Sequence, residues 1–295
     1  MGWDFLKSSF VFVIIVIGFI ILLLAPRIMT VHNLGGYYTP KTEMTYKENI
    51  QAFIHDFQTE GFGENRYGTA VLEELQAFIK RDLIIVIPAF VLSIILGTFL
   101  GVVQFQFREG PFGKIQAFFS WIFSSIPDFF FYIAVQYALI KLFYVGLPQF
   151  NLYGNDQWYS FILPMIAVML YPMLHISKFT FTSLENEVGQ DYLRTAHAKG
   201  LRTISVLKHM LWNCLGSLLN QTQFVMLYIL TSLLIIEKLS SYFGAGYHLY
   251  GSIINNEDQR TLAFILPYLL LMFMTVIFTK VCRHWLVPRK SGDSR

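Results

Sequence analysis

Long apolar stretches alternate with shorter polar segments along the chain. A helix needs about 20 largely apolar residues to cross a membrane, because its ~1.5 Å rise per residue must cover ~30 Å of hydrocarbon. Pro127 interrupts the third of these stretches, and the fifth carries several amide side chains. The pattern predicts an all-α, polytopic membrane protein with six transmembrane helices. The six stretches are residues 9–25, 83–107, 115–144, 158–176, 211–236 and 262–285.

The composition supports a membrane protein over the other broad classes. Hydrophobic residues make up 55% of the 295 residues and charged residues only 14%, whereas a soluble domain usually carries about 25% charged residues. A formal net charge of +3 is too small for the dense basic face of a nucleic-acid-binding protein. The 2 cysteines exclude a disulfide framework.

The charges of the loops predict the orientation. Basic residues gather between the fourth and fifth stretches and again in the C-terminal tail. These two regions lie on the same side of a six-span protein, which the positive-inside rule makes the cytoplasm. Both termini are therefore expected in the cytoplasm. The first stretch ends in Ala25-Pro26-Arg27 without a small-x-small cleavage site, so we expect a retained helix rather than a signal peptide.

These features divide the chain into four predicted parts. An N-terminal transmembrane helix covers residues 1–26, and a long first external loop covers residues 27–81. Residues 82–289 form the core with the other five transmembrane helices, and residues 290–295 form a cytoplasmic tail.

The external loop carries the signals of two amphipathic helices. Thr45, followed three residues later by Glu48, reads as a capping box, and apolar residues at helical spacing follow it until Gly61. A second stretch, residues 71–79, places its apolar residues on one face. The pair either packs over the outer face of the bundle or forms a docking surface for an external partner.

The cytoplasmic segment 183–212 predicts a helix-turn-helix. Residues 183–199 suit a short helix, Gly200 permits the left-handed backbone that ends one, and a second helix begins near Thr203. An apolar stripe with a charged rim is what a helix-in-groove contact requires, although such a helix can also lie on lipid headgroups. The stripe consists of Leu184, Val188, Tyr192 and Ala196.

This segment resembles a known family. Residues 187–201 read Glu-Val-Gly-Gln-Asp-Tyr-Leu-Arg-Thr-Ala-His-Ala-Lys-Gly-Leu, which is similar to the cytoplasmic EAA loop of bacterial ABC transporter permeases, in particular the oligopeptide, dipeptide and nickel branch. Weaker similarities keep the family's order between about Gly61 and Arg289. The chain departs from the family at Gly216-Ser217 and at Phe243, where proline is usual.

The resemblance implies partners. In this family the loop docks into a cleft of an ATPase subunit, two permease subunits share one path, and an external solute-binding protein delivers the solute. The sequence has no Walker A pattern G-x-x-x-x-G-K-[ST], so ATP is expected on a partner subunit and no cofactor on this chain. The resemblance assigns ATPase coupling to Glu187, Gly189, Asp191, Tyr192, Arg194, Thr195, Ala196, Ala198, Lys199 and Gly200.

Polar side chains inside the apolar stretches are costly in lipid unless they face protein or water. Either they line the translocation path, or they form hydrogen bonds between helices. The candidates for the path are Ser125, Pro127, Asp128, Asn213, Asn220, Gln221 and Gln223.

The sequence does not point to an enzyme. No H-E-x-x-H pattern occurs, and the spacings of His175, His197 and His209 match no metal motif. We therefore expect neither a catalytic residue nor a metal site.

The expected function is that of a permease subunit of an ATP-driven ABC importer in the bacterial cell membrane, with oligopeptides or dipeptides as the solute. Nickel or a metal chelate is an alternative solute. Alternatives of another class are a degenerate permease that serves as a membrane scaffold or sensor, and an ion-coupled carrier, against which the few intramembrane carboxylates argue.

Overall fold

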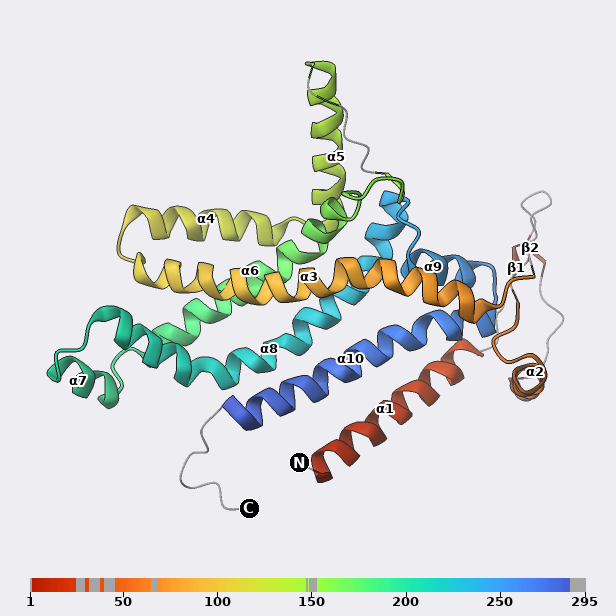
Figure 1. Ribbon diagram of the computed structural model, residues 1–295, viewed down its shortest axis with the longest axis horizontal. Coiled ribbons are helices and arrows are strands. Elements are labelled where there is room, and N and C mark those ends of the chain that lie inside the picture. Colours follow the sequence, from red (N-terminus) through yellow and green to blue (C-terminus); the bar gives the residue numbers. More distant parts are fainter. Residues whose placement is uncertain are drawn as a thin grey trace. The chain divides into compact units, whose positions relative to one another are not determined.

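The computed structural model describes residues 2–24, 30–31, 38–39, 46–64, 68–146, 148 and 153–286. Nearly all of the described elements are helices (Figure 1). The two short strands pair antiparallel, with Thr30 opposite Thr39 and Val31 opposite Tyr38. The all-α prediction is confirmed. In chain order the elements are α1 (Gly2–Leu23), β1 (Thr30–Val31), β2 (Tyr38–Thr39), α2 (Tyr46–Glu60), α3 (Val71–Gln106), α4 (Pro111–Ser125), α5 (Asp128–Tyr144), α6 (Ile162–Glu187), α7 (Asp191–Ala198), α8 (Thr203–Ser240), α9 (Ala245–Ile254) and α10 (Asp258–Leu286).

Five described helices are long and apolar enough to cross a membrane: α1 from Phe5 onward, α3, α6, α8 and α10. Each overlaps one of the predicted stretches. The bent pair of α4 and α5 makes a sixth if the two helices count as one span. The protein is therefore a multi-pass membrane protein, with five or six spans among the residues that the structure describes.

The third predicted stretch is interrupted at Pro127, as the sequence indicates. α4 and α5 meet at an angle of 100° across a short break, and Figure 1 shows α5 turning away from α4. Pro127 has no backbone N–H and forces the preceding residue out of the helical region. Ile126 is accordingly extended, with φ −91° and ψ 123°. The two pieces have 15 and 17 residues, each shorter than the length of a full span.

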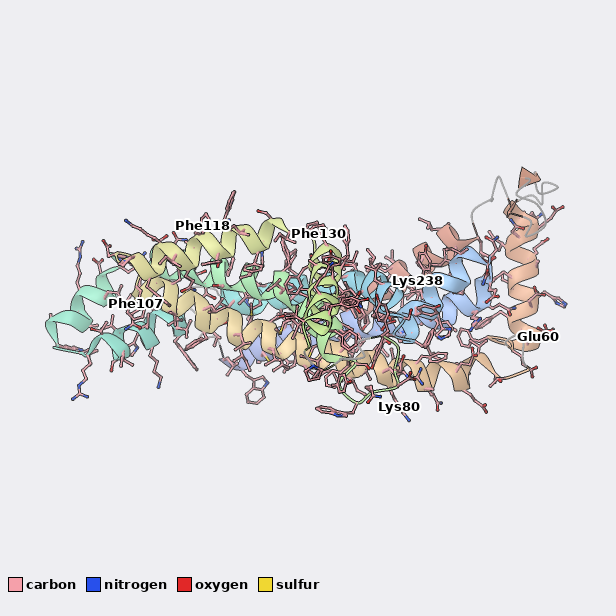
Figure 2. The ribbon with its side chains drawn as sticks, turned by 90° about the horizontal axis from the view of Figure 1, so that it is seen from above. Glu60, Lys80, Phe107, Phe118, Phe130 and Lys238 are labelled. Atoms are coloured by element: carbon pink, nitrogen blue, oxygen red, sulfur yellow. The ribbon has the colours of Figure 1, made fainter. Side chains whose placement is uncertain are left out.

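Most large apolar side chains of α4 and α5 are exposed and are not covered by other parts of this chain. Phe118 on α4 and Phe130 on α5 are 57% and 56% exposed (Figure 2). In a membrane protein such faces contact lipid or another chain.

The segment predicted as a loop with two amphipathic helices, residues 27–81, contains one of the two as a separate helix. α2 ends at Glu60, and Gly61 follows with φ +64°, which confirms the first amphipathic helix; Thr45 lies outside the described residues. The separate second helix is wrong, because α3 runs unbroken from Val71 to Gln106. Lys80-Arg81-Asp82 contains no helix breaker, so the helix continues into the span.

The chain divides into two compact units. One consists of residues 1–81 with 244–273, and the other of residues 82–243 with 274–295. Both α3 and α10 contribute residues to each unit.

A row of small residues brings α3 very close to α6 in the second unit. Ala89, Ser93, Gly97 and Gly101 lie four residues apart and are buried. The Ser93 hydroxyl donates to the carbonyl oxygen of Met169 at 3.2 Å. A Cβ atom on Gly97 or Gly101 would lie only 2.6 or 2.5 Å from a carbonyl oxygen of α6. Small residues at this spacing allow the backbones of membrane helices to approach closely.

The first unit has a half-buried ionic cluster. The guanidinium of Arg260 lies 3.1 Å from a carboxylate oxygen of Glu74 and 3.0 Å from one of Glu257. His248 stacks on Phe78 with 3.9 Å between ring centroids. Burial and the nearby Arg260 lower the pKa of His248 to about 4.

We expect Gly101→Leu to destabilise the protein. The new side chain would clash with the backbone of α6 at Ser177, and overpacking of this kind costs about 1–3 kcal/mol. The thermal unfolding midpoint of the detergent-solubilised protein should fall by roughly 2–10 °C. Gly18→Leu is the matched control, because no atom lies within 4 Å of a Cβ at Gly18. Equal midpoints for the two variants would contradict the close approach.

Stability should also fall as the pH drops from about 6.5 to 4, because the unfolded chain then protonates His248 while the folded protein keeps it neutral. The loss should be about 1–2 kcal/mol, and His248→Phe should remove it. Denaturant unfolding between pH 7 and pH 4.5 measures this. His55→Phe serves as the control, since His55 is exposed. If both variants keep the pH dependence of the parent, the loss does not come from His248.

Candidate functional site

The predicted helix-turn-helix corresponds to α7, the turn at Gly200 and the start of α8. A second glycine turn, at Gly189, precedes α7. α6 ends at Glu187, and Gly189 follows with φ +94°. After α7, Gly200 has φ +70°, and α8 begins at Thr203. The predicted turn at Gly200 and the start of the second helix are confirmed. The single short helix over residues 183–199 is wrong, because the left-handed backbone at Gly189 ends α6 and separates it from α7.

The apolar face of α7 packs on the protein itself rather than facing outward. Leu193 and Ala196 are only 6% and 8% exposed and belong to one buried cluster with Leu184 of α6 and several residues of α8. The predicted stripe is therefore split, since Val188 is 50% exposed while Leu184 and Ala196 are buried. The α8 members of the cluster are Val206, Met210, Cys214 and Leu218.

A hydrogen bond joins the end of α6 to α7. The Tyr192 hydroxyl donates to a carboxylate oxygen of Glu187 at 2.5 Å. Burial, together with this hydrogen bond, raises the pKa of Tyr192 to about 12. Tyr192 therefore keeps its proton at neutral pH and remains a donor to Glu187. This bond and the buried cluster fix α7 against α8.

The outward face of α7 is small and polar. Arg194 lies 3.5 Å from Asp191, but both side chains are largely exposed, so the pair adds little stability. The Thr195 hydroxyl donates to the carbonyl oxygen of Asp191 at 3.1 Å. The exposed residues on α7 and directly after it are Asp191, Arg194, Thr195, Ala198 and Lys199. All except Ala198 are polar, and we call this surface the polar face.

The candidate path residues do not form one group. Asn213 and Asn220 are exposed on α8 and lie two turns apart on the same face. Gln221 contacts the Nε2 atom of His175 on α6 at 3.1 Å, so it forms a bond between helices. Gln223 is half-buried on α8.

The other three candidates lie at the break between α4 and α5. Ser125 is exposed, and its hydroxyl donates to the carbonyl oxygen of Trp121 at 2.9 Å. Pro127 precedes α5. The carboxylate of Asp128 accepts hydrogen bonds from the backbone N–H of Phe129 at 2.8 Å and from the hydroxyl of Ser232 on α8.

Sequence reasoning missed the aromatic side chains that accompany these groups. The rings of Tyr171 and Tyr228 stack at 4.5 Å, and those of His175 and Phe224 lie 4.3 Å apart. A spacing of three or four residues places Tyr171 and His175 on one face of α6, and Phe224 and Tyr228 on one face of α8. That spacing is the signal that identifies them from the sequence.

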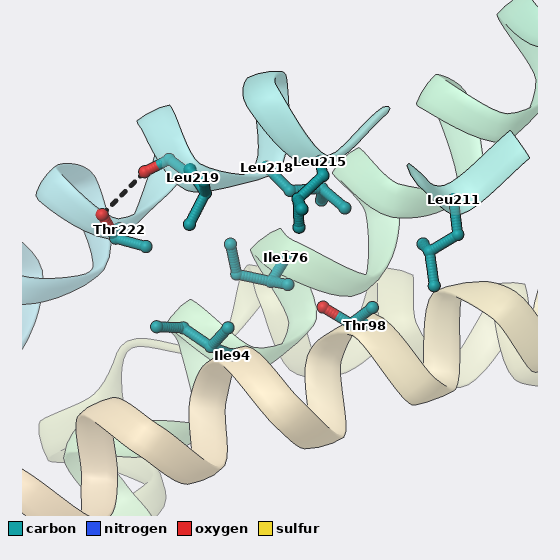
Figure 3. A pocket seen from close by; sticks show the side chains of 8 residues that line it. All are labelled: Ile94, Thr98, Ile176, Leu211, Leu215, Leu218, Leu219 and Thr222. Carbon is teal, nitrogen blue, oxygen red and sulfur yellow. Dashed lines mark hydrogen bonds between the residues drawn. The ribbon is translucent and has the colours of Figure 1, made fainter. Parts of the chain in front are cut away.

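The second unit also holds an apolar pocket of about 100 Å³ between α3, α6 and α8 (Figure 3). The hydroxyl of Thr222 donates to the carbonyl oxygen of Leu219 at 2.7 Å, so it is already satisfied. The pocket offers little to a polar solute. Its lining residues are Ile94, Thr98, Ile176, Leu211, Leu215, Leu218, Leu219 and Thr222.

No group of three or more His, Cys, Asp or Glu side chains gathers as a metal site within the described ranges. His175 lies in the middle of α6 and His209 near the start of α8. The side chain of His197 lies outside the described residues.

Several transport system permeases are similar in sequence to this chain over about two thirds of its length. It is 27% identical over 205 residues to the dipeptide transport system permease protein DppB of Lactococcus lactis, covering 68% of this chain and 65% of the relative. It is 28% identical over 202 residues to DppB of Bacillus subtilis, covering 68% and 64%. The glutathione transport system permease protein GsiC of Pectobacterium atrosepticum is 28% identical over 184 residues, covering 61% and 59%. The chain thus spans just under two thirds of the length of these relatives.

A family described as the binding-protein-dependent transport system inner membrane component matches residues 82–292. This match includes α7, both of its glycine turns and all of the candidate path residues. It covers well over half of the chain, and the family is one of transport components rather than enzymes. The chain therefore belongs to the family of inner membrane components of binding-protein-dependent transport systems.

Proposed function

We propose that this chain is the permease subunit of an ATP-driven importer and forms part of the path for small peptides. The observation that carries the proposal is α7, a short helix whose apolar face is buried in the chain and whose polar face is presented outward between two glycine turns. A fixed polar surface of this kind is suited to a cleft on a partner. The relatives named for dipeptide and glutathione transport support a peptide as the solute.

The partners follow from this proposal. ATP binds to ATPase subunits that receive α7, because the sequence of this chain has no Walker A pattern. A second permease subunit completes the path, and an external solute-binding protein delivers the peptide. α7 and both termini then face the cytoplasm of the bacterial cell.

The coupling and path roles rest on the same proposal. Glu187, Tyr192 and Ala196 hold α7 in place, Gly189 and Gly200 make its turns, and its polar face contacts the ATPase. Asn213, Asn220 and Gln223 on α8, with Ser125 and Pro127 at the helix break, border the path. Peptides are favoured over nickel, since the named relatives carry peptide or glutathione transport in their names and none carries nickel.

We expect the double variant Arg194→Glu/Lys199→Glu to lower ATP-dependent peptide uptake at least tenfold. Both side chains are exposed, so the change should spare the fold while it reverses the charge offered to the ATPase. Uptake in proteoliposomes and co-purification of the ATPase from membranes measure the effect. Lys47→Glu on α2 is the control, because it reverses an exposed charge outside the coupling loop. If the double variant transports as well as the control, α7 is not the coupling element.

A second prediction concerns Tyr192→Phe, which removes the hydroxyl bonded to Glu187. A hydrogen bond to a charged group contributes about 1.5–3 kcal/mol, so α7 should detach more often from the end of α6. Hydrogen exchange in α7 should become faster, and more ATP should be hydrolysed for each peptide transported. Tyr144→Phe, at an exposed tyrosine of α5, should change neither quantity. Unchanged exchange in Tyr192→Phe would show that the bond does not hold α7.

The proposal as a whole is tested by isolating the protein from native membranes and identifying what co-purifies with it. An ATPase, a second permease and a solute-binding protein are expected. Their absence, in a detergent that preserves known transporter complexes, would favour a scaffold or an ion-coupled carrier.

A further inference from the structure

One continuous strip of polar and aromatic side chains runs along α6 and α8. Neighbouring members touch: Tyr171 stacks on Tyr228 at 4.5 Å, His175 lies 4.3 Å from Phe224, and the rings of Phe224 and Tyr228 are 6.2 Å apart. All members are half-buried, so each leaves part of its side chain uncovered by this chain. We call this set the Asp128 strip; its members are Asp128, Tyr171, His175, Gln221, Phe224 and Tyr228.

The strip lies in the middle part of α6 and α8, away from the ends of both helices. His175 and Gln221, which contact each other at 3.1 Å, stand near the midpoints of α6 and α8. Asp128, at one end of the strip, bonds to Ser232 of α8. The distance along α8 from Gln221 to Ser232 is about 16 Å at ~1.5 Å per residue. That length exceeds an extended dipeptide or tripeptide, which spans about 7–11 Å.

Asp128 brings a negative charge to one end of the strip. Its carboxylate accepts hydrogen bonds from the backbone N–H groups of Phe129 and of Asp128 itself, and from the hydroxyls of Ser232 and Tyr228. All four donors are neutral. No lysine or arginine in the described part of the chain makes an ion pair with it. These four donors fill about four acceptor positions of the carboxylate, but none of them balances its negative charge.

Helix packing accounts for only part of the strip. The contact between Gln221 and His175 is an ordinary polar bond between membrane helices. It does not explain a carboxylate that is bonded to a membrane-spanning helix and satisfied only by neutral groups, because a charge is expensive within a membrane bundle. If the only role of residue 128 were to accept the hydrogen bond from Ser232, the side-chain oxygen of an asparagine there would serve equally well. The charge at Asp128 therefore calls for a cation.

The surroundings of Asp128 match an organic ammonium group. The faces of tyrosine rings attract ammonium groups within about 6 Å. Tyr228 bonds to the carboxylate, and its ring stacks with that of Tyr171. Further along, His175 and Gln221 supply donors and acceptors suited to peptide amides. The order of groups is thus a carboxylate, an aromatic pair and a polar pair.

We propose that Asp128 determines solute specificity by binding the protonated amino terminus of the peptide, which then lies along the Asp128 strip. This inference rests on the proposed permease function. It assigns the solute class as small peptides with a free α-amino group, and it places the amino end at the break between α4 and α5.

The test compares one dipeptide in two forms, with a free and with an acetylated amino terminus, in proteoliposomes that hold the whole transporter with its binding protein. The quantity compared is the ratio of kcat/KM for uptake of the two forms. Loss of one charge-assisted hydrogen bond corresponds to roughly tenfold or more in this ratio. Asp128→Asn should lower the preference for the free amine about tenfold, while Asp128→Glu should retain most of it.

Thr231→Val is the matched control. Thr231 precedes Ser232 on α8, but its side chain is exposed and bonds only to carbonyl oxygens of its own helix. Its ratio should equal that of the parent. Co-purification of the ATPase with each variant confirms that the complex is assembled.

The outcomes separate the two proposals. If the parent protein takes up neither peptide in an ATP-dependent manner, the permease function itself is refuted. If the parent imports the free dipeptide and Asp128→Asn keeps the same preference, the ammonium site is refuted and the function stands. If the acetylated form is not imported by any variant, kcat/KM for the free dipeptide decides: about a tenfold loss in Asp128→Asn supports the site, and no loss relative to Thr231→Val overturns it.

Discussion

The carbonyl oxygens of Met173 and Ser177 on α6 lie so near α3 that only glycine fits opposite them. This close approach fixes α3 against α6 in the second unit. Because α3 covers one face of α6, the other faces remain for α8 and for the strip of side chains between α6 and α8. The contact is made by van der Waals packing and by the Ser93 hydrogen bond, since lipid provides no hydrophobic force that drives helices together.

The helix break at Pro127 is a second constraint on the structure. It determines where the Asp128 carboxylate lies. A straight helix through this position would carry Asp128 inside an ordinary turn. The bend instead makes Asp128 the first residue of α5, where its carboxylate accepts the Phe129 N–H and reaches Ser232 on α8. Backbone groups released by such a break are tolerated at membrane depth only where protein or water satisfies them.

The sequence was sufficient for features that depend on local chemistry. Apolar length located the spans, and the two glycines Gly61 and Gly200 marked turns that the structure has. It was insufficient where three-dimensional packing decides. Nothing local shows that Val71 begins the same helix that crosses the membrane, or that Ala196 faces α8 rather than a partner. The effect of Pro127 was visible as an interruption, but its 100° bend depends on what α5 packs against.

The contact made by Ser93, Gly97 and Gly101 also could not be predicted from the sequence alone. Their four-residue spacing is readable in the sequence, yet glycine in a helix is ambiguous, since it permits close approach as well as flexibility. The aromatic members of the Asp128 strip are equally visible as spacings. What assigns them to one surface is the antiparallel pairing of α6 with α8, which joins residues more than 40 positions apart.

The turns at Gly189 and Gly200 connect α7 to two long helices, α6 and α8. α6 has 26 residues and α8 has 38, which at ~1.5 Å per residue makes α8 about 57 Å long. Tilting such a rod by about 5° at one end moves its far end by about 5 Å, and the position of Ser232 by about 4 Å. A displacement of that size exceeds the length of a hydrogen bond. The helices thus act as levers, and their length sets how small a movement of α7 is enough to separate Ser232 from Asp128.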